Sequence, residues 1–178
     1  LVTTAIALPA VPVKTRQMSK LSGALVAALT VSALPVATVV AAPAQAAGTS
    51  RQTLMSRTYT CDRQPINYMK FRFPAVPTAE ISSDGRTAVA HVDMLDGARN
   101  AQYVVRLIPA PHATLGCLPG DPSIGTGTLS TDGFGNGNST VPLSVAPGTS
   151  GVWVAVELPA PHSQSPAEFY SSDFVASV

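Results

Sequence analysis

Two histidines close a repeated phrase and are the side chains in this sequence best suited to metal chemistry. Residues 107–112 read Leu-Ile-Pro-Ala-Pro-His, and residues 158–162 read Leu-Pro-Ala-Pro-His. Each phrase follows an apolar run, and its two prolines favour an extended exit from a strand before the histidine. If both strands run in the same direction, His112 and His162 emerge at one end, where they could bind Cu(II), Zn(II) or an anionic ligand.

The alternative interpretation of this repeat is structural. Pro-Ala-Pro is a natural strand-ending phrase in a chain rich in alanine and proline, and metal sites usually need three or four ligands at defined spacing. We therefore predict no metal centre and no cofactor, and keep His112 and His162 as candidates for small-molecule or metal binding. His91 stands beside Asp93 on a predicted strand and is interpreted as a solvated side chain.

The loop from Asp132 to Gly137 resembles a calcium-binding loop in part. It has oxygen-bearing side chains at positions one and five and glycine at position six. Position three is Phe134, however, and position twelve is Leu143 where a bidentate glutamate is needed. The pattern therefore favours a plain turn without calcium.

The sequence contains two cysteines, Cys61 and Cys117. In an exported protein a single pair most often forms a structural disulfide, which in the chain-entropy model stabilises the fold by about 4 kcal/mol for a loop of this span. A redox pair and a pair of metal thiolates are the alternatives, and neither is supported by Cys-x-x-Cys spacing. We predict a Cys61–Cys117 disulfide.

No motif for catalysis is present. The sequence has no Gly-x-Ser-x-Gly elbow, no His-Glu-x-x-His and no phosphate-binding glycine loop. Its glutamates, Glu80, Glu157 and Glu168, are not paired by any pattern typical of glycosidases. We assign no catalytic residues and expect a protein that is not an enzyme.

The N-terminal region has the three parts of a secretory signal peptide. Lys14, Arg16 and Lys20 precede an uncharged apolar run over residues 21–40, which ends in Ala44-Gln45-Ala46. Cleavage is predicted between Ala46 and Ala47, giving a signal peptide over residues 1–46 and a domain over residues 47–178. A membrane anchor is the alternative, but Pro35 and the many alanines argue against it. Residues 1–17 are interpreted as an over-long start, with Met18 as the initiator.

Removing this segment changes the charge. Of the 11 Lys and Arg residues, 8 remain against all 10 Asp and Glu residues, so the formal net charge falls from +1 to −2. A mildly acidic domain with scattered charges has no basic stripe for nucleic acid and no polybasic patch for membranes. We expect no nucleic-acid partner and no stable membrane span after cleavage. We also expect a secreted or extracellular protein, which could be associated with the cell wall.

The remaining sequence alternates apolar and polar residues between short turns, which predicts an all-β fold. Asp84-Gly85, Asp96-Gly97 and Pro147-Gly148 supply turn chemistry. We predict a single antiparallel immunoglobulin-like β-sandwich of about seven to nine strands. The expected strands are residues 67–73, 87–94, 102–108, 140–145, 152–158 and 169–173.

Trp153 is the single tryptophan and alternates with Val152, Val154 and Val156, so it falls on the opposite face of its strand. An exposed tryptophan beside Tyr103 or Tyr170 would be a candidate binding contact. Burial in the sandwich is the more usual fate of a tryptophan at such a position.

Three neighbouring segments form a recognisable predicted hairpin: the Gly127–Asp132 segment, the Gly135-Asn136-Gly137 turn and the alternating Ser139–Val145 strand. The predicted strand over residues 169–173, near the end of the chain, adds to the pattern. This predicted hairpin resembles those of uncharacterised secreted immunoglobulin-like β-sandwich proteins of actinobacteria. The resemblance covers under a sixth of the chain. A more distant one is to the chromophore-binding apoproteins of enediyne antibiotics, which carry two disulfides where this chain can form one.

Two functions are therefore expected. The first is a secreted or cell-envelope, non-catalytic module that binds an extracellular ligand through its loops or a sheet face, or has a structural role. The second is a small-molecule or metal-ion binder that uses the loops bearing His112 and His162.

Overall fold

The computed structural model describes residues 48–66 and 73–178. These residues belong to a compact unit formed by residues 41–178. The predicted signal peptide, its cleavage point between Ala46 and Ala47, and most of the strand expected over 67–73 lie outside the described residues.

The described residues form nine β-strands and no helix, which confirms the all-β prediction. Their bounds are β1 (Gly48–Met55), β2 (Thr78–Ser83), β3 (Thr87–Met94), β4 (Gln102–Ala110), β5 (Gly125–Ser130), β6 (Gly137–Ser144), β7 (Gly151–Leu158), β8 (Glu168–Ser172) and β9 (Ala176–Ser177).

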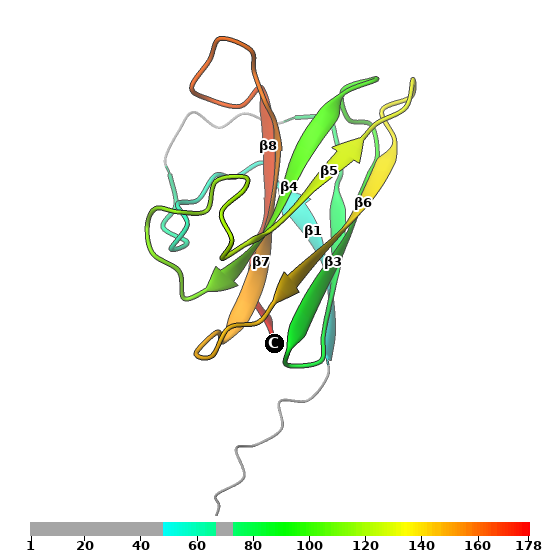
Figure 1. Cartoon of the computed structure of the whole chain (residues 1–178). Helices are drawn as coiled ribbons and strands as arrows, with labels where there is room; N and C mark the ends of the chain where they lie inside the picture. Colours follow the sequence, from blue (N-terminus) through cyan, green and yellow to red (C-terminus); the bar gives the residue numbers. More distant parts are fainter. Residues whose placement is uncertain (1–47, 67–72) are drawn as a thin grey trace, which may run out of the picture. The chain divides into compact units, whose positions relative to one another are not determined.

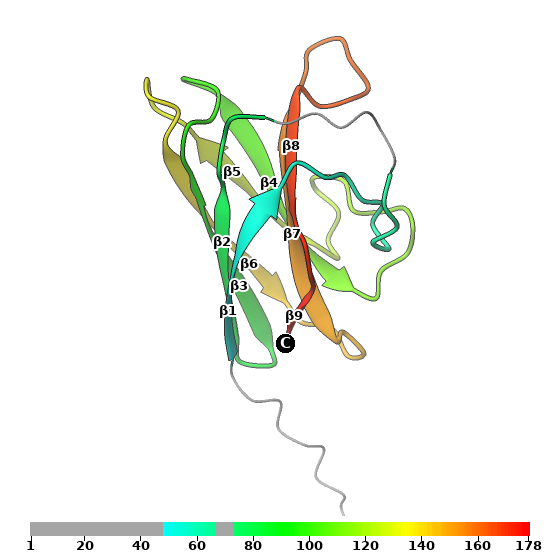
Figure 2. The same cartoon turned by 180° about the vertical axis from the view of Figure 1, so that it is seen from behind.

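All strand pairs are antiparallel and join into one sheet in the order β5-β4-β7-β8-β1-β2-β3-β6, with β9 added beside β7 (Figures 1 and 2). β1 pairs with β2 along most of its length, and then Leu54 and Met55 pair with β8. The sheet therefore curls round from one layer to the other and is nearly barrel-shaped.

β5 and β6 are the two ends of this sheet, and they lie side by side (Figure 1). The hairpin expected from residues 127–145 is not a hydrogen-bonded pair, because β5 pairs with β4 and β6 pairs with β3. β5 can approach β6 this closely because it has glycine at the points of contact, where a side chain would collide. A Cβ on Gly127 would lie 2.6 Å from Cγ2 of Val141, and one on Gly125 would lie 2.5 Å from the carbonyl oxygen of Pro142.

The inner face of the sheet encloses the main core. The alternation predicted for β3 is confirmed, since its inward side chains are all buried: Ala88, Ala90, Val92 and Met94. β7 differs, because six consecutive residues from Gly151 to Val156 are buried and both of its faces are therefore covered. A second apolar cluster lies on the outer side of β4 and β7; its buried members are Cys61, Ile108, Cys117, Ile124, Trp153 and Ala155.

Within residues 48–66 and 73–178, no helix is long and apolar enough to cross a membrane.

Candidate functional site

The predicted disulfide is present. Cys61 and Cys117 are bonded, and their Cα atoms lie 5.7 Å apart, within the usual range for a disulfide. The bond joins the segment that follows β1, residues 56–66, to the loop that follows β4, residues 111–124. We call the first segment the strap.

The strap covers Trp153. As predicted, Trp153 points away from the valines of β7, and its side chain is 2% exposed, so it takes the expected buried position and offers no surface contact. Tyr59 packs edge-on against the indole at 6.2 Å between ring centroids, and the guanidinium carbon of Arg63 lies 5.2 Å from the indole centroid. Tyr103 and Tyr170, the expected neighbours of an exposed tryptophan, are buried in the inner core.

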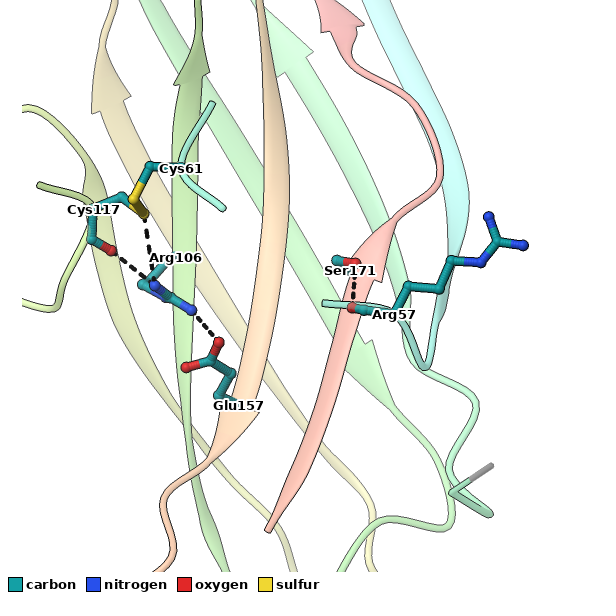
Figure 3. Close-up of polar contacts among 6 residues, drawn as sticks. All are labelled: Arg57, Cys61, Arg106, Cys117, Glu157 and Ser171. Carbon is teal, nitrogen blue, oxygen red and sulfur yellow. Dashed lines mark hydrogen bonds and ion pairs between the residues drawn. A yellow bond between two sulfur atoms is a disulfide. The ribbon is translucent and has the colours of Figure 1, made fainter. Parts of the chain in front are cut away.

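Arg63 fastens the strap to β8 and the residue after it. Its Nη1 donates to the carbonyl oxygen of Ser172 at 2.6 Å, and its Nη2 donates to that of Asp173 at 2.7 Å. The hydroxyl of Ser171 also donates to the carbonyl oxygen of Arg57 at 2.7 Å (Figure 3). The strap is therefore held at Arg57 and Arg63 to the end of β8, in addition to the disulfide at Cys61.

A buried ion pair lies under the disulfide, on the same face of the sheet. Nη2 of Arg106 pairs with Oε1 of Glu157, and Nη1 donates to the carbonyl oxygen of Cys117 at 2.9 Å and lies 3.9 Å from its Sγ (Figure 3). Arg106 is 8% exposed. Because a buried guanidinium needs a countercharge, Glu157 has a structural role here.

His112 and His162 do not form one site. β4 and β7 are antiparallel, with Val104 opposite Glu157 and Ala110 opposite Gly151. The two histidines therefore leave from opposite ends of this strand pair, which is about 20 Å long by strand rise. The expectation of one end holding both imidazoles is wrong, because it required parallel strands.

Each histidine has an ordinary loop environment. Nε2 of His112 lies 3.1 Å from the hydroxyl of Ser123, and its Nδ1 lies 2.8 Å from the carbonyl oxygen of Ala113. His162 is exposed at the tip of the β7–β8 loop. No cluster of three or more His, Cys, Asp or Glu side chains able to hold a metal occurs in the described part of the chain.

The Asp132 loop is a turn held by its own aspartate. Oδ1 of Asp132 accepts hydrogen bonds from the backbone N–H of Phe134 at 2.8 Å and of Asn136 at 2.9 Å. These bonds lower the pKa of Asp132 below its ordinary value. One carboxylate oxygen of Asp132 therefore closes the turn by accepting two backbone hydrogen bonds.

This turn presents an apolar tip together with its neighbours. Phe134 is 76% exposed, Leu95 55% and Val76 51%. The three come from separate segments joined by backbone hydrogen bonds, Gly97 N–H to Gly135 O at 2.9 Å and Val76 N–H to Leu95 O at 3.1 Å. We call Val76, Leu95 and Phe134 the apolar tip.

Two tyrosines and a carboxylate support the loops from inside the sheet. Oη of Tyr103 donates to Oε2 of Glu168 at 2.6 Å, and Oη of Tyr170 donates to the same oxygen at 3.0 Å. The Tyr103 oxygen also accepts the backbone N–H of Ala98 at 2.8 Å. Burial, followed by the interactions with Glu168, raises the pKa of both tyrosines.

A polar groove lies beside the apolar tip, on the outer side of β1, β2, β3 and β6. Its volume is about 550 Å³, and its lining includes Leu95, Arg51 and the carboxylates of Asp93 and Asp132. A ligand that contacts the apolar tip therefore meets a charged surface directly next to it.

The chain matches no protein-family model, and the searches of curated proteins and of solved structures returned no match. The resemblance to actinobacterial immunoglobulin-like proteins stays a prediction.

The apolar tip was not singled out by sequence reasoning, although one signal for it was present. Phe134 is an aromatic residue in the middle of Asp132-Gly-Phe-Gly-Asn-Gly. A large apolar side chain at the centre of a turn has few neighbours to bury it, whereas Leu95 and Val76 join it only through tertiary structure.

Proposed function

We propose that this protein is an exported, non-catalytic binding module of the immunoglobulin-like kind, and that it binds a protein partner through the apolar tip. Export is supported by the signal-like N-terminal sequence and by the Cys61–Cys117 disulfide, because disulfides persist mainly in oxidising compartments.

The chain path supports the immunoglobulin-like part of the proposal. β3 leads across to β4, β5 leads back to β6, and β6 leads across again to β7. Crossings of this kind between two antiparallel layers are typical of Greek-key sandwiches. They also gather the β3–β4, β5–β6 and β7–β8 loops at one end (Figure 1).

One observation carries the binding proposal: Phe134 is largely exposed on a turn that is rigidly built. Its neighbours Asp132, Gly135 and Asn136 are all fixed by backbone hydrogen bonds. Anchoring residues of protein interfaces are often aromatic, and a loop whose backbone is already held in one conformation loses less entropy on binding.

The charges around the apolar tip indicate the partner's chemistry. Asp96 and Asp132 are exposed in the same two loops, and Asp93 lines the adjoining groove. These acidic side chains outnumber the two basic ones nearby, which are Arg51 in the groove and Arg99 on the β3–β4 loop. We therefore expect a partner with an apolar pocket for Phe134 and basic residues at its rim.

Site-specific photo-crosslinking in the cells that produce the protein tests this function. A photoreactive phenylalanine analogue replaces Phe134 or, separately, Leu95. We expect a discrete covalent adduct from both positions. Excess unmodified protein should abolish the adduct, and Asp96→Asn, which removes a negative charge without touching the Asp132 turn, should weaken it.

Leu115 and Leu118 provide the matched control. They are 83% and 72% exposed, but both lie on the loop that carries Cys117, at the opposite end of β4. The same analogue at these positions is expected to give no adduct. Equal adducts at both ends, or none at either end, would show that the apolar tip is not the binding surface.

A further inference from the structure

A small, partly enclosed cavity lies between the strap and the sheet. Its volume is about 10 Å³, and its lining includes Thr58 and Tyr59 from the strap and Arg106, Trp153 and Glu157 from β4 and β7. A site that holds one water molecule needs about this volume, roughly 10–15 Å³.

Three buried polar atoms belong to residues that line this cavity. They are Nε1 of Trp153, Nε of Arg106 and Oγ1 of Thr58, and none has a hydrogen-bond partner among residues 48–66 and 73–178. Trp153 and Arg106 are both more than nine-tenths buried. Leaving one such group unpaired is strongly unfavourable, so three in residues that line one cavity call for a shared partner.

The chemistry of the three atoms specifies that partner. The indole and guanidinium nitrogens carry N–H groups and can only donate, whereas the hydroxyl can donate or accept. A water molecule would accept both N–H donors and donate to Oγ1 of Thr58, which gives it the three hydrogen bonds typical of buried water.

A halide ion also accepts hydrogen bonds, but the local charge disfavours it. The guanidinium of Arg106 is already neutralised by Glu157, which lines the same cavity. An anion here would be buried beside a carboxylate without a free countercharge, and burial of an unpaired charge is strongly unfavourable.

We propose that this cavity is a binding site for one ordered water molecule, which joins the strap to the sheet through Thr58, Arg106 and Trp153. The water lies on the outer side of the sheet, away from the apolar tip, and its role is independent of partner binding. It forms hydrogen bonds with the polar atoms of Arg106, Trp153 and Thr58 that have no protein partner among the described residues.

Crystallography of the disulfide-bonded protein at about 1.5 Å or better tests the site directly. We expect one density peak within hydrogen-bond distance of Nε1 of Trp153 and Nε of Arg106. Crystals soaked in bromide are expected to show no anomalous peak there. An unfilled cavity, a side chain that occupies it, or an anomalous bromide peak would each overturn the proposal.

A solution measurement uses the single tryptophan, whose indole N–H gives one unambiguous NMR signal. Thr58→Val removes the hydroxyl and should speed hydrogen exchange of this N–H about tenfold, the effect of losing one hydrogen bond. Thr58→Ser keeps the hydroxyl and should leave the exchange rate at the wild-type value. Equal exchange rates in the two variants would contradict a role for Thr58 in holding the water.

Discussion

The guanidinium carbon of Arg63 lies 4.4 Å from the ring centroid of Tyr59 and 5.2 Å from that of Trp153. A residue of the strap thereby covers the single tryptophan of the protein, which would otherwise lie open on the outer side of β7. This relationship turns a potential binding surface into a second core.

Arg63→Ala removes this cover together with two hydrogen bonds to the backbone of Ser172, at the end of β8, and of Asp173, the residue after it. We expect a loss of about 1–3 kcal/mol in the free energy of unfolding, because cation–π and charge-assisted contacts disappear together. Tryptophan fluorescence should shift to longer wavelength as water reaches the indole. Arg99→Ala, at an exposed position on the β3–β4 loop, should change neither the stability nor the emission.

The Arg106–Glu157 pair predicts a non-additive result. Glu157→Ala leaves a buried guanidinium without its countercharge and should destabilise the protein by about 2–4 kcal/mol. This loss is smaller than that caused by breaking a fully buried ion pair, because Glu157 is partly exposed. The double variant Arg106→Met/Glu157→Leu should recover most of that loss, since no buried charge remains. Urea unfolding of the two variants measures the difference, and equal losses would contradict a charge-burial effect.

The disulfide closes a loop with a sequence separation of 56. Replacing both cysteines by serine should lower the free energy of unfolding by about 2–4 kcal/mol, because the unfolded chain regains conformational freedom. Thermal unfolding with and without a reductant provides the measurement. The reductant should destabilise the wild type to a similar degree and should leave the double variant unchanged.

Stability should fall at alkaline pH because of Tyr103 and Tyr170. Both have pKa values raised above the ordinary 10.0 in the folded protein, so the unfolded chain releases these protons first. Their contribution to stability is therefore present below about pH 10 and is lost as the pH rises above it. Thermal midpoints measured between about pH 9 and 11 should show this fall.

Two variants test the cause of that alkaline fall. Tyr103→Phe removes one of the two buried hydroxyls, and Glu168→Gln removes the negative charge next to both. Each variant should show a shallower decrease of the melting temperature with pH than the wild type. The same slope in all three proteins would rule out the two tyrosines as the origin.

Gly135 should be essential for the apolar tip, and Gly133 should not. Gly135 has a φ of +85°, and a Cβ there would lie 2.1 Å from the carbonyl oxygen of Gly97, whereas a Cβ on Gly133 would meet nothing within 4 Å. Gly135→Ala should cost about 1–3 kcal/mol and disturb the loop that carries Phe134. Gly133→Ala should be neutral, and equal melting temperatures for the two variants would contradict this account.

The strand pattern was predictable because it depends on local sequence. Strict alternation in Ala88, Ala90, Val92 and Met94 identified the buried face of β3, and Asp-Gly pairs marked the turns at Gly85 and Gly97. β1 and β2 were missed, because their serines, threonines and charged residues give a weak apolar signal. The order of strands could not be predicted, since pairing joins residues far apart in the chain.

Sequence alone determined which way Trp153 points, since alternation along β7 is a property of extended backbone. It also indicated the disulfide, because a chain that is predicted to be exported and has one pair of cysteines has one natural pairing. Only the tertiary structure decided that the strap buries Trp153 and that antiparallel pairing separates His112 from His162. Both outcomes depend on which distant segment lies on a given face, and packing of the whole chain selects that segment.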